Sequence, residues 1–447
     1  MRLIAREATL RALGTYRRYG SLPDKGFGSL YDGNTSDPRE SALVLQIFNG
    51  VLQNMAYLDF IVSSFSSMDI KKIHPLILDI LRLSVYQIIF LDRIPHSAAV
   101  NEGVLLAKKQ SNPRTAGFVN AVLRKVAASA SQDCLPEVAN EDEFQYLSVK
   151  YSHPEWLVRE FCGRLGPDET EKLLRINNSS DTPMTAQVNT LSTDVGTVLS
   201  SLAADGVETS QHEWLSDCVL MRRFGPVESL EAFKKGHIYI QDVAARLVVL
   251  AADPKPGQYV IDGCAAPGGK SITAAIKMNG IGKILACDVS ISKLERIKES
   301  VSRLGIGIIS VFERNALERD QLLTDKADVV FADVPCSGFG TIRKKPDIRY
   351  KPQEKISGLT NLQRDILSNL ATYVKPGGTL LYSTCTVLEH ENEGVIESFL
   401  SEHKDFSAVS FELPGLGRVP DGKITLWPHI HGTDGFFICK MRRSEAE

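Results

Sequence analysis

Two cysteines and an aspartate follow two apolar runs in the C-terminal half of the chain. Asp333 and Cys336 lie three residues apart in V-V-F-A-D-V-P-C-S-G (329–338), and Cys385 follows L-L-Y-S-T (380–384). In a parallel sheet both loops would open at the same edge, so a carboxyl group and two thiols could meet in one pocket. A lone cysteine at a strand end is usually a small buried hydrophobe, but two of them beside polar residues favour a functional site.

This combination of groups suits methylation of a pyrimidine at carbon 5. That carbon is a poor nucleophile until a thiolate adds to carbon 6 of the ring. A nearby acid can then stabilise charge on a ring nitrogen, and a base must remove the carbon-5 proton before the thiolate leaves. Cys385, Asp333 and Cys336 could fill these places, but their spacing alone does not identify which thiol is the nucleophile.

A glycine-containing loop follows another short apolar run, in Q-Y-V-I-D-G-C-A-A-P-G-G-K-S (258–271). Apolar residues resume after it with helical spacing, so the stretch predicts a strand, a tight loop and a helix. Gly268 and Gly269 would let a ligand approach the backbone closely, at the positive end of the helix dipole. A nucleotide-like ligand fits such a loop.

Several explanations compete for this loop. Its glycines do not follow the G-x-G-x-x-G pattern of a dinucleotide-binding fold. The G-K-S at 269–271 matches the end of a Walker A phosphate loop, but Cys264 occupies the position of the opening glycine. An S-adenosylmethionine site is favoured because Asp262 ends the first strand and Asp288 ends the next one, where a carboxylate can accept hydrogen bonds from ribose hydroxyls. A merely structural glycine turn is the remaining alternative.

Strand-like and helical segments alternate from residue 258 onward. The expected strands are Tyr259–Ile261, Ile284–Cys287, Ile308–Phe312, Ala327–Ala332 and Gly378–Ser383. Such alternation predicts an α/β domain with a doubly wound, mostly parallel sheet and ligands at the carboxyl ends of its strands. A late pair of runs, Thr379–Tyr382 and Phe436–Cys439, could supply an antiparallel edge.

The rest of the chain predicts further domains, so the fold class is multidomain. Residues 1–130 show helical spacing throughout and predict an all-α bundle. A polar linker over 131–145 and a small α+β unit over 146–235 then lead into the catalytic domain, 236–447.

Composition argues against a membrane, disulfide or structural-metal protein. Of the 447 residues, 43% are hydrophobic and 23% charged, and the eight cysteines show no C-x-x-C pair or zinc spacing. The cysteine pattern therefore favours a reducing, cytoplasmic location. The N-terminus lacks the apolar core of a signal peptide. A net charge of −3 leaves RNA binding to local patches, of which R-K-K-P-D-I-R-Y-K (343–351) is the best candidate because its basic side chains could reach phosphates.

Three long motifs resemble those of the RNA cytosine-5 methyltransferase family, often called the Nol1/Nop2/Sun or Fmu group. They are D-G-C-A-A-P-G-G-K-S (262–271), D-V-P-C-S-G-F-G-T-I-R-K-K-P-D-I-R-Y (333–350) and Y-S-T-C-T-V-L-E-H-E-N-E (382–393). The N-terminal part, with L-R-L-S-V-Y-Q-I-I-F-L-D-R-I-P (81–95), resembles the NusB-like helical domain of the family's bacterial small-subunit branch. The resemblance covers nearly the whole chain.

The resemblance implies a class I, Rossmann-like methyltransferase that uses S-adenosylmethionine to modify carbon 5 of a cytosine in small-subunit (16S) ribosomal RNA. Cys385 would be the covalent nucleophile, and Cys336 would assist product release. Asp333 would lie between the cofactor and the target cytosine. Lys270 is expected to be a further catalytic residue. The residues expected to bind the cofactor are Cys264, Ala265, Ala266, Pro267, Gly268, Gly269, Lys270, Asp288, Asn315 and Asp333. The enzyme is expected to be a monomer without metal, whose helical domain helps to grip the RNA.

Two positions depart from the family pattern. Asn315 stands where relatives usually have an aspartate near the adenine, and Gln187 stands where they generally have an arginine, so one RNA-facing charge would be missing. Three alternatives remain open: methylation of another RNA such as tRNA or large-subunit rRNA, a P-loop-like NTPase that uses Lys270, and a non-catalytic RNA-binding protein. Retention of both thiols argues against the last alternative.

Overall fold

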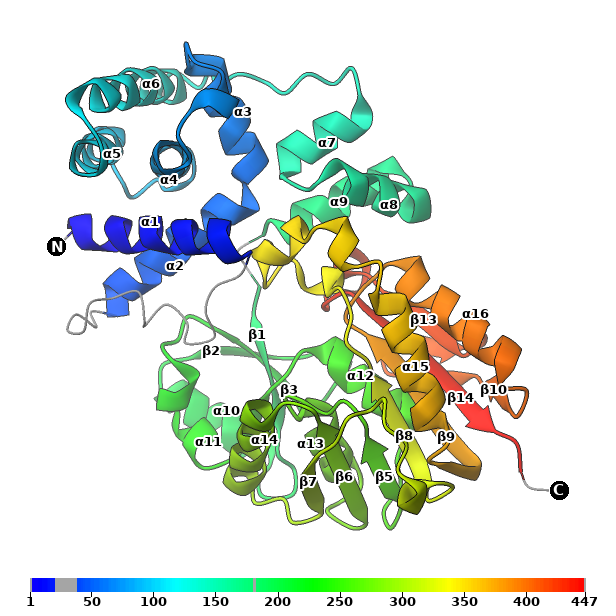
Figure 1. The fold of residues 1–447 in the computed structure, drawn as a ribbon. Coiled ribbons are helices and arrows are strands. Elements are labelled where there is room, and N and C mark those ends of the chain that lie inside the picture. Colours follow the sequence, from blue (N-terminus) through cyan, green and yellow to red (C-terminus); the bar gives the residue numbers. More distant parts are fainter. Residues whose placement is uncertain (1, 21–37, 180–181, 446–447) are drawn as a thin grey trace. The chain divides into compact units, whose positions relative to one another are not determined.

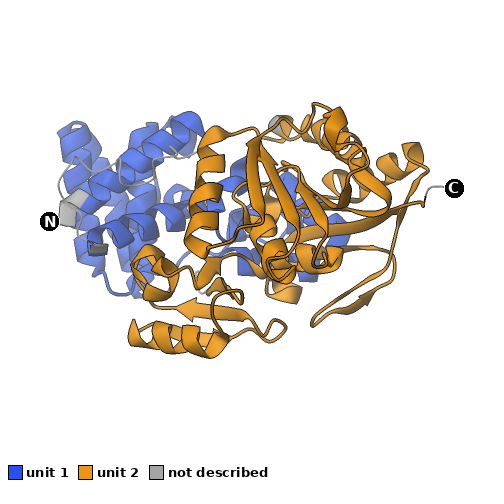
Figure 2. Cartoon of the chain, turned by 90° about the horizontal axis from the view of Figure 1, so that it is seen from below, with its two compact units in different colours: residues 1–179, 342–351 blue, residues 180–341, 352–447 orange. Residues whose placement is uncertain are grey.

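The computed structural model describes residues 2–20, 38–179 and 182–445. The chain forms two compact units, which Figure 2 shows in different colours. Unit 1 comprises residues 1–179 and the segment 342–351, and unit 2 comprises residues 180–341 and 352–447. Ten residues from the C-terminal half of the sequence therefore belong to the N-terminal unit.

Unit 1 is built from helices, as the sequence predicts (Figure 1). They are α1 Arg2–Tyr19, α2 Pro38–Gln53, α3 Met55–Phe65, α4 Pro75–Phe90, α5 His96–Gln110, α6 Pro113–Ser131, α7 Glu143–Tyr151, α8 Glu155–Leu165 and α9 Pro167–Asn177. Proline occupies the first position of α4 and α6, behind the capping side chains of His74 and Asn112. One continuous apolar core joins α1 to α6.

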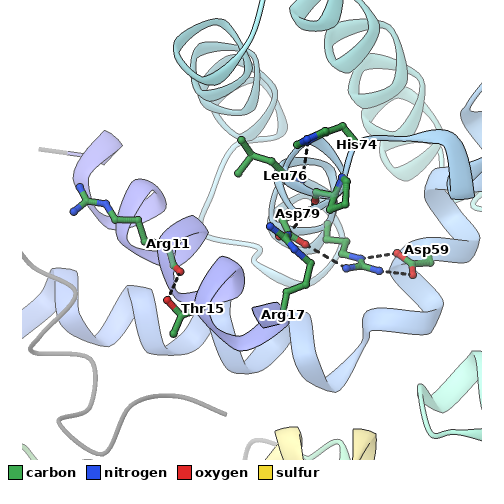
Figure 3. Close-up of polar contacts among 9 residues, drawn as sticks. Arg11, Thr15, Arg17, Asp59, His74, Leu76 and Asp79 are labelled. Carbon is green, nitrogen blue, oxygen red and sulfur yellow. Dashed lines mark hydrogen bonds and ion pairs between the residues drawn. The ribbon is translucent and has the colours of Figure 1, made fainter. Parts of the chain in front are cut away.

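Asp79 and Arg82 of α4 together connect this helix with α1 and α3 (Figure 3). Asp79 of α4 is 3% exposed and accepts hydrogen bonds from Arg17 of α1 and from Arg82, whose Nη1 lies 3.3 Å away. Arg82 also donates to both carboxylate oxygens of Asp59 in α3, each at 2.7 Å. The two guanidinium groups offset the hydration that the Asp79 carboxylate loses on burial.

Unit 2 begins with a small antiparallel sheet of four strands, in the order β2-β3-β1-β4. The strands are β1 Met184–Val188, β2 Glu208–Gln211, β3 Cys218–Arg222 and β4 Ile238–Ile240, and the helices α10 Val195–Ala204 and α11 Glu231–Lys234 accompany them. Val198 and Leu202 of α10 share an apolar core with Val188 of β1. The predicted small α+β unit is therefore present.

The larger sheet of unit 2 has eight strands. Seven follow the order β10-β14-β9-β8-β5-β6-β7, and β13 also pairs with β14. Their bounds are β5 Tyr259–Asp262, β6 Lys283–Asp288, β7 Ile309–Glu313, β8 Ala327–Asp333, β9 Val374–Thr384, β10 Phe406–Ala408, β13 Lys423–Leu426 and β14 Phe436–Arg443. Strands β5 to β9 are parallel, and β14 is antiparallel to β9 as predicted. Two short strands, β11 Phe411–Leu413 and β12 Gly417–Val419, pair separately.

Helices cover both faces of this sheet (Figure 1), because neighbouring residues of a strand point to opposite sides. Val260 of β5 packs in one core with α12 Val243–Ala252, α13 Gly269–Lys277 and α14 Ile291–Leu304. Ile261 packs in the other core with α15 Leu359–Ala371 and α16 Glu393–Glu402. A last short helix, α17, spans Pro428–His431.

Strand β5 has β6 on one side and β8 on the other, so the order of the strands reverses there. Doubly wound sheets bind ligands at this switch point, which here faces the loop between β5 and α13. None of the helices in the described ranges is long and apolar enough to cross a membrane.

Candidate active site

Four neighbouring parallel strands bring polar residues to one edge of the large sheet. Strands β6, β5 and β8 end in Asp288, Asp262 and Asp333, and β9 ends one residue before Cys385. The register places Asp333 beside Ser383 of β9. The strand ends that the sequence analysis singled out therefore converge, as a parallel sheet requires.

The loop after β5 is fastened to the end of β6. The backbone N–H of Ala265 donates to the carbonyl of Cys287 at 2.8 Å, and that of Ala266 donates to Asp288 Oδ2 at 3.2 Å. Cys264, in the same loop, is partly exposed, and burial raises the pKa of its thiol. These two hydrogen bonds fix the loop relative to β6, and the Cys264 thiol in it stays protonated.

Glycine is required where this loop enters α13. Gly268 has a φ of 102°, a conformation that other residues rarely adopt, and it follows the cis peptide bond between Ala266 and Pro267. A side chain on Gly269 would come within 2.7 Å of Gln241 Nε2. A bare backbone at a helix N-terminus, next to the carboxylate of Asp288, fits the polar and ribose parts of S-adenosylmethionine.

Asn315 lies just beyond β7 and is exposed. Its Oδ1 accepts a hydrogen bond from the N–H of Leu317 at 3.1 Å, and its Nδ2 donates to Glu318 Oε1 at 3.0 Å. Both ends of the amide therefore take part in a local turn.

Lys270 connects the glycine loop with the end of β8. Its Nζ lies 2.6 Å from Asp333 Oδ2, and Ser383 Oγ donates to Asp333 Oδ1 at 2.8 Å. The ammonium group also lies 5.1 Å from the centre of the Phe436 ring, within range of a cation–π interaction. Each oxygen of Asp333 thus has its own donor, so the orientation of this carboxylate is fixed.

Asp262, at the end of β5, is fully buried. Its Oδ2 accepts a hydrogen bond from Ser271 Oγ at 2.7 Å. Burial raises the pKa of Asp262 to about 7, and the charges of Asp333 and Asp288 act in the same direction. The base of the cofactor loop therefore contains a carboxyl group that titrates near neutral pH.

The two thiols lie together. The Sγ atoms of Cys336 and Cys385 are 3.3 Å apart, and both side chains are partly exposed. The hydrogen bond with Cys385 and burial hold the pKa of the Cys336 thiol well above its usual value. Each sulfur therefore lies within hydrogen-bonding distance of the other.

Close backbone packing fixes the Cys385 loop. The N–H of Gly340 donates to the carbonyl of Cys385 at 2.9 Å, and the N–H of Gly435 donates to the carbonyl of Gly340 at 2.8 Å. A Cβ on Gly340 would lie 1.9 Å from the carbonyl oxygen of Gly435 and 2.8 Å from that of Cys385. No side chain fits at position 340 unless one of these backbones moves.

We therefore expect Gly340→Ala to displace Cys385. The rate at which iodoacetamide alkylates Cys385, followed by mass spectrometry, should change by about 10-fold in this variant. Overpacking at position 340 should also lower the free energy of unfolding by about 1–3 kcal/mol. Gly358→Ala is the matched control, because there is no atom within 4 Å of its added Cβ. Indistinguishable behaviour of the two variants would contradict the role given to the close contact.

Three buried residues near the thiols were not identified from the sequence. Ser383 holds Asp333, and Glu391 and Asn392 bind the loops that carry the two cysteines. All three stand in the motif Y-S-T-C-T-V-L-E-H-E-N-E. Polar residues in an expected loop are usually solvated, so their types alone did not indicate a buried network.

Part of the predicted RNA-binding patch is wrong. Lys344 and Lys345 are exposed, but Arg349 is fully buried within unit 1. Its Nη1 donates to Asn178 Oδ1 at 2.7 Å and to the carbonyl of Gln53 at 3.0 Å. This guanidinium group holds helices together and does not face RNA phosphates.

The expectation that position 187 faces RNA is also wrong. Gln187 is 1% exposed, and its Oε1 lies 2.7 Å from Thr273 Oγ1 of α13. The alternation of β1 turns this side chain toward the interior of unit 2. Within residues 2–20, 38–179 and 182–445, no group of three or more His, Cys, Asp or Glu side chains could hold a metal ion.

Known families match most of the chain. The family described as 16S rRNA methyltransferase RsmB/F matches residues 249–442. The NusB family matches residues 4–128, and a ferredoxin-like domain of RsmF/B-like methyltransferases matches residues 153–228. The expected architecture of a NusB-like bundle, a small α+β domain and a Rossmann-like methyltransferase is confirmed.

Relatives extend this match over the full length. The probable ribosomal RNA small subunit methyltransferase B of Bacillus subtilis is 37% identical, over 99% of this chain and 98% of the relative. The ribosomal RNA small subunit methyltransferase B of Erwinia tasmaniensis is 31% identical over 90% of each chain. The crystal structure of PH0851 has a TM-score of 0.79 and 28% identity, over 98% of this chain and 99% of that one. Together with the cofactor loop and the strand ends described above, these matches show that the chain belongs to the RsmB/F family of S-adenosylmethionine-dependent 16S rRNA methyltransferases.

Proposed function

We propose that this protein methylates carbon 5 of a cytosine in small-subunit ribosomal RNA through a covalent adduct with Cys385. One observation carries the proposal: two thiols lie 3.3 Å apart at the strand ends that also present the fixed carboxylate of Asp333. Ring nitrogens and ribose hydroxyls already have lone pairs that accept a methyl group, so their methylation requires no nucleophilic thiol. Carbon 5 of a pyrimidine does require one.

The loop 264–270 would hold the cofactor. S-adenosylmethionine, when bound there, supplies an electrophilic methyl group. Gly268 and Gly269 permit a close approach to the N-terminus of α13, and Asp288 offers its carboxylate to ribose hydroxyls. Asn315 would lie near the adenine, where its amide has one N–H hydrogen and one oxygen lone pair beyond those used in its local turn.

Cys385 and Asp333 would act on the base first. The thiolate of Cys385 forms a bond with carbon 6, and carbon 5 becomes nucleophilic. The proton of the Cys385 thiol passes to the carboxylate of Asp333, which then shares it with the ring nitrogen on which negative charge develops. Lys270 and Ser383 hold that carboxyl group in one orientation, so its position costs no reorganisation during the reaction.

Cys336 would assist the final step. The thiolate of Cys336 takes the proton from carbon 5, the electron pair of that C–H bond forms the ring double bond, and the bond between carbon 6 and the sulfur of Cys385 breaks. The neighbouring sulfur of Cys336, 3.3 Å away, is close enough to take part in this elimination. The free thiolate of Cys385 is thereby restored.

Cys336→Ala should therefore trap the protein on its RNA. With S-adenosylmethionine and a 16S rRNA transcript, we expect a covalent complex that survives denaturing electrophoresis, because the adduct forms and does not resolve. Cys134→Ala, which removes an exposed cysteine of unit 1, is the control and should give no such complex. An inactive Cys336→Ala, together with trapping by Cys385→Ala, would reverse the two roles.

The target base is tested in cells. Bisulfite mapping of ribosomal RNA, with and without the protein, should reveal one 5-methylcytosine in 16S rRNA that depends on it. A dependent site in tRNA or large-subunit rRNA would instead support one of the alternative substrates. We further propose that the enzyme acts as a cytoplasmic monomer, in which the NusB-like bundle helps to bind the RNA.

A further inference from the structure

Two consecutive buried residues, Glu391 and Asn392, each contact the chain around one of the active-site cysteines. Both are 0% exposed, and they immediately precede α16. Neither has a part in the chemistry proposed above. Their partners differ, because Glu391 binds the loop of Cys336 whereas Asn392 binds the loop of Cys385.

The Cys336 loop is held through both neighbours of the cysteine. The N–H of Ser337 donates to Glu391 Oε2 at 2.9 Å, and Ser337 Oγ donates to Glu391 Oε1. Gln363 Nε2 donates to Glu391 Oε2 at 2.8 Å and to the carbonyl of Pro335 at 3.0 Å. The residues before and after Cys336 are thus tied to one buried carboxylate and one amide.

The Cys385 loop is held in the same way by a single amide. Thr384 Oγ1 donates to Asn392 Oδ1 at 2.6 Å, and Asn392 Nδ2 donates to the carbonyl of Thr386 at 3.1 Å. Asn392 occupies the N-cap position of α16, where asparagine usually binds a free N–H of the helix, but it makes no side-chain cap bond there. Its side chain serves the cysteine loop and not the helix.

Three hydrogen-bond donors compensate for the burial of the Glu391 carboxylate. A buried carboxylate is costly unless donors replace its hydration, and here the N–H and O–H of Ser337 and the amide of Gln363 do so. A glutamine could not accept all three hydrogen bonds with its single oxygen in the same positions. The pKa of the Cys336 thiol is raised mainly by its hydrogen bond with Cys385 and by burial, and the charge of Glu391 raises it further.

We propose that Glu391 and Asn392 are positioning residues with separate tasks: Glu391 holds Cys336 for product release, and Asn392 holds Cys385 for attack on the base. The kinetic part of this inference rests on the covalent mechanism proposed above. The placement of the two thiols rests only on the hydrogen bonds described.

The first test examines the thiols in the full-length protein without RNA. Iodoacetamide alkylation of each cysteine is followed by peptide mass spectrometry. We expect Glu391→Gln to change the alkylation rate of Cys336 at least about 5-fold more than that of Cys385. Glu391 binds the Cys336 loop directly, whereas it reaches the Cys385 loop only through the contact of Ser337 Oγ with Thr386 Oγ1 at 2.8 Å. Asn392→Ala should give the opposite pattern.

The second test follows the covalent complex with a 16S rRNA transcript and S-adenosylmethionine. Glu391→Gln should form the complex at the wild-type rate but resolve it about 10- to 100-fold more slowly, so that the complex accumulates. Asn392→Ala should form the covalent complex about 10- to 100-fold more slowly than the wild type, and the complex should not accumulate. A general loss of stability would not separate formation from resolution in this way.

Matched variants keep both tests decisive. Ser337→Ala and Thr384→Val remove the hydroxyls that bind Glu391 and Asn392, together with the contacts of these hydroxyls at Thr386, and leave residues 391 and 392 unchanged. They should repeat the two patterns if a change at 391 or 392 prevents folding. Glu389→Gln and His390→Ala change exposed residues of the same turn and should behave as wild type.

Two results overturn the proposal: both variants slow the same step, or the exposed controls reproduce their effects. A different result would separate the proposal from the mechanism beneath it. If alkylation shows the two patterns while neither the wild type nor Cys336→Ala ever binds RNA covalently, the positioning role stands and the covalent mechanism fails.

Discussion

Cys385→Ala is expected to abolish methyl transfer to 16S rRNA, with a loss on the order of 10⁴-fold or more, while S-adenosylmethionine still binds. Without the sulfur, no bond forms at carbon 6 and carbon 5 stays a poor nucleophile. The cofactor loop, 264–270, has its own anchors on the end of β6, so its structure does not depend on this side chain. Transfer of labelled methyl groups and calorimetric titration with the cofactor measure the two properties separately.

Cys385→Ser sharpens this experiment. A serine hydroxyl keeps the size and polarity of the site but is not ionised at neutral pH, so we expect the same loss of activity. Cys134→Ala should retain full activity. Methyl transfer by Cys385→Ala at a rate within about 10-fold of the wild type would show that the reaction needs no nucleophile at this position.

Arg349→Met is expected to destabilise unit 1 by about 3–5 kcal/mol. The guanidinium group is fully buried and donates hydrogen bonds to five oxygen atoms at the ends of three helices. They are the carbonyl oxygens of Gln53, Tyr151, Ser152 and Asn177, and Oδ1 of Asn178. Helices α2, α7 and α9 end at Gln53, Tyr151 and Asn177, so the negative ends of three helix dipoles surround one positive charge.

Methionine fills a similar volume but removes the donor that Arg349 supplies to these buried acceptors, which is the costly half of a broken buried interaction. The carbonyls of Tyr151 and Ser152 keep other donors, from Asn178 and Tyr350. Burial lowers the pKa of Arg349 to about 10, so the group remains charged at neutral pH. Because a protein of several domains need not unfold in one step, hydrogen exchange of the amides in α7 and α9 is the appropriate measurement. Faster exchange in these helices is the expected result.

Lys345→Met is the control, since it removes the same charge from an exposed position of the same segment. It should leave hydrogen exchange unchanged. Two results together would show that Arg349 binds RNA. Arg349→Met would leave hydrogen exchange in α7 and α9 unchanged, and it would reduce the slope of the binding constant against salt concentration (log–log) by about the amount expected for one phosphate contact.

The sequence predicted the catalytic domain well because its signals are local. Each predicted strand of the large sheet is an apolar run that ends in a polar residue, and the structure moves the bounds by only a few residues, as in β8 at Ala327–Asp333. A parallel sheet then brings those ends together whatever the side chains are. The approach of Cys336 to Cys385 follows from this geometry.

Contacts between distant side chains were beyond such reasoning. Arg349 lies in a basic run of the kind that is usually solvated, and its burial depends on helices that precede it by more than a hundred residues. Gln187 is turned inward by its place in β1, which only the pairing of the small sheet decides. Glu391 and Asn392 were part of a quoted motif, yet a carboxylate and an amide have too many uses for their types to indicate the loops that they hold.

The position of Arg349 in the sequence also orders events during synthesis. A nascent chain that has emerged as far as Asn177 contains the described α-helices of unit 1, α1 to α9, but its three converging helix ends still lack their shared cation. At roughly 5–20 residues per second, the ribosome needs about 10–30 s more to deliver it. During that interval the three helix ends lack this buried donor, so a truncated product that stops before residue 349 has an incomplete unit 1.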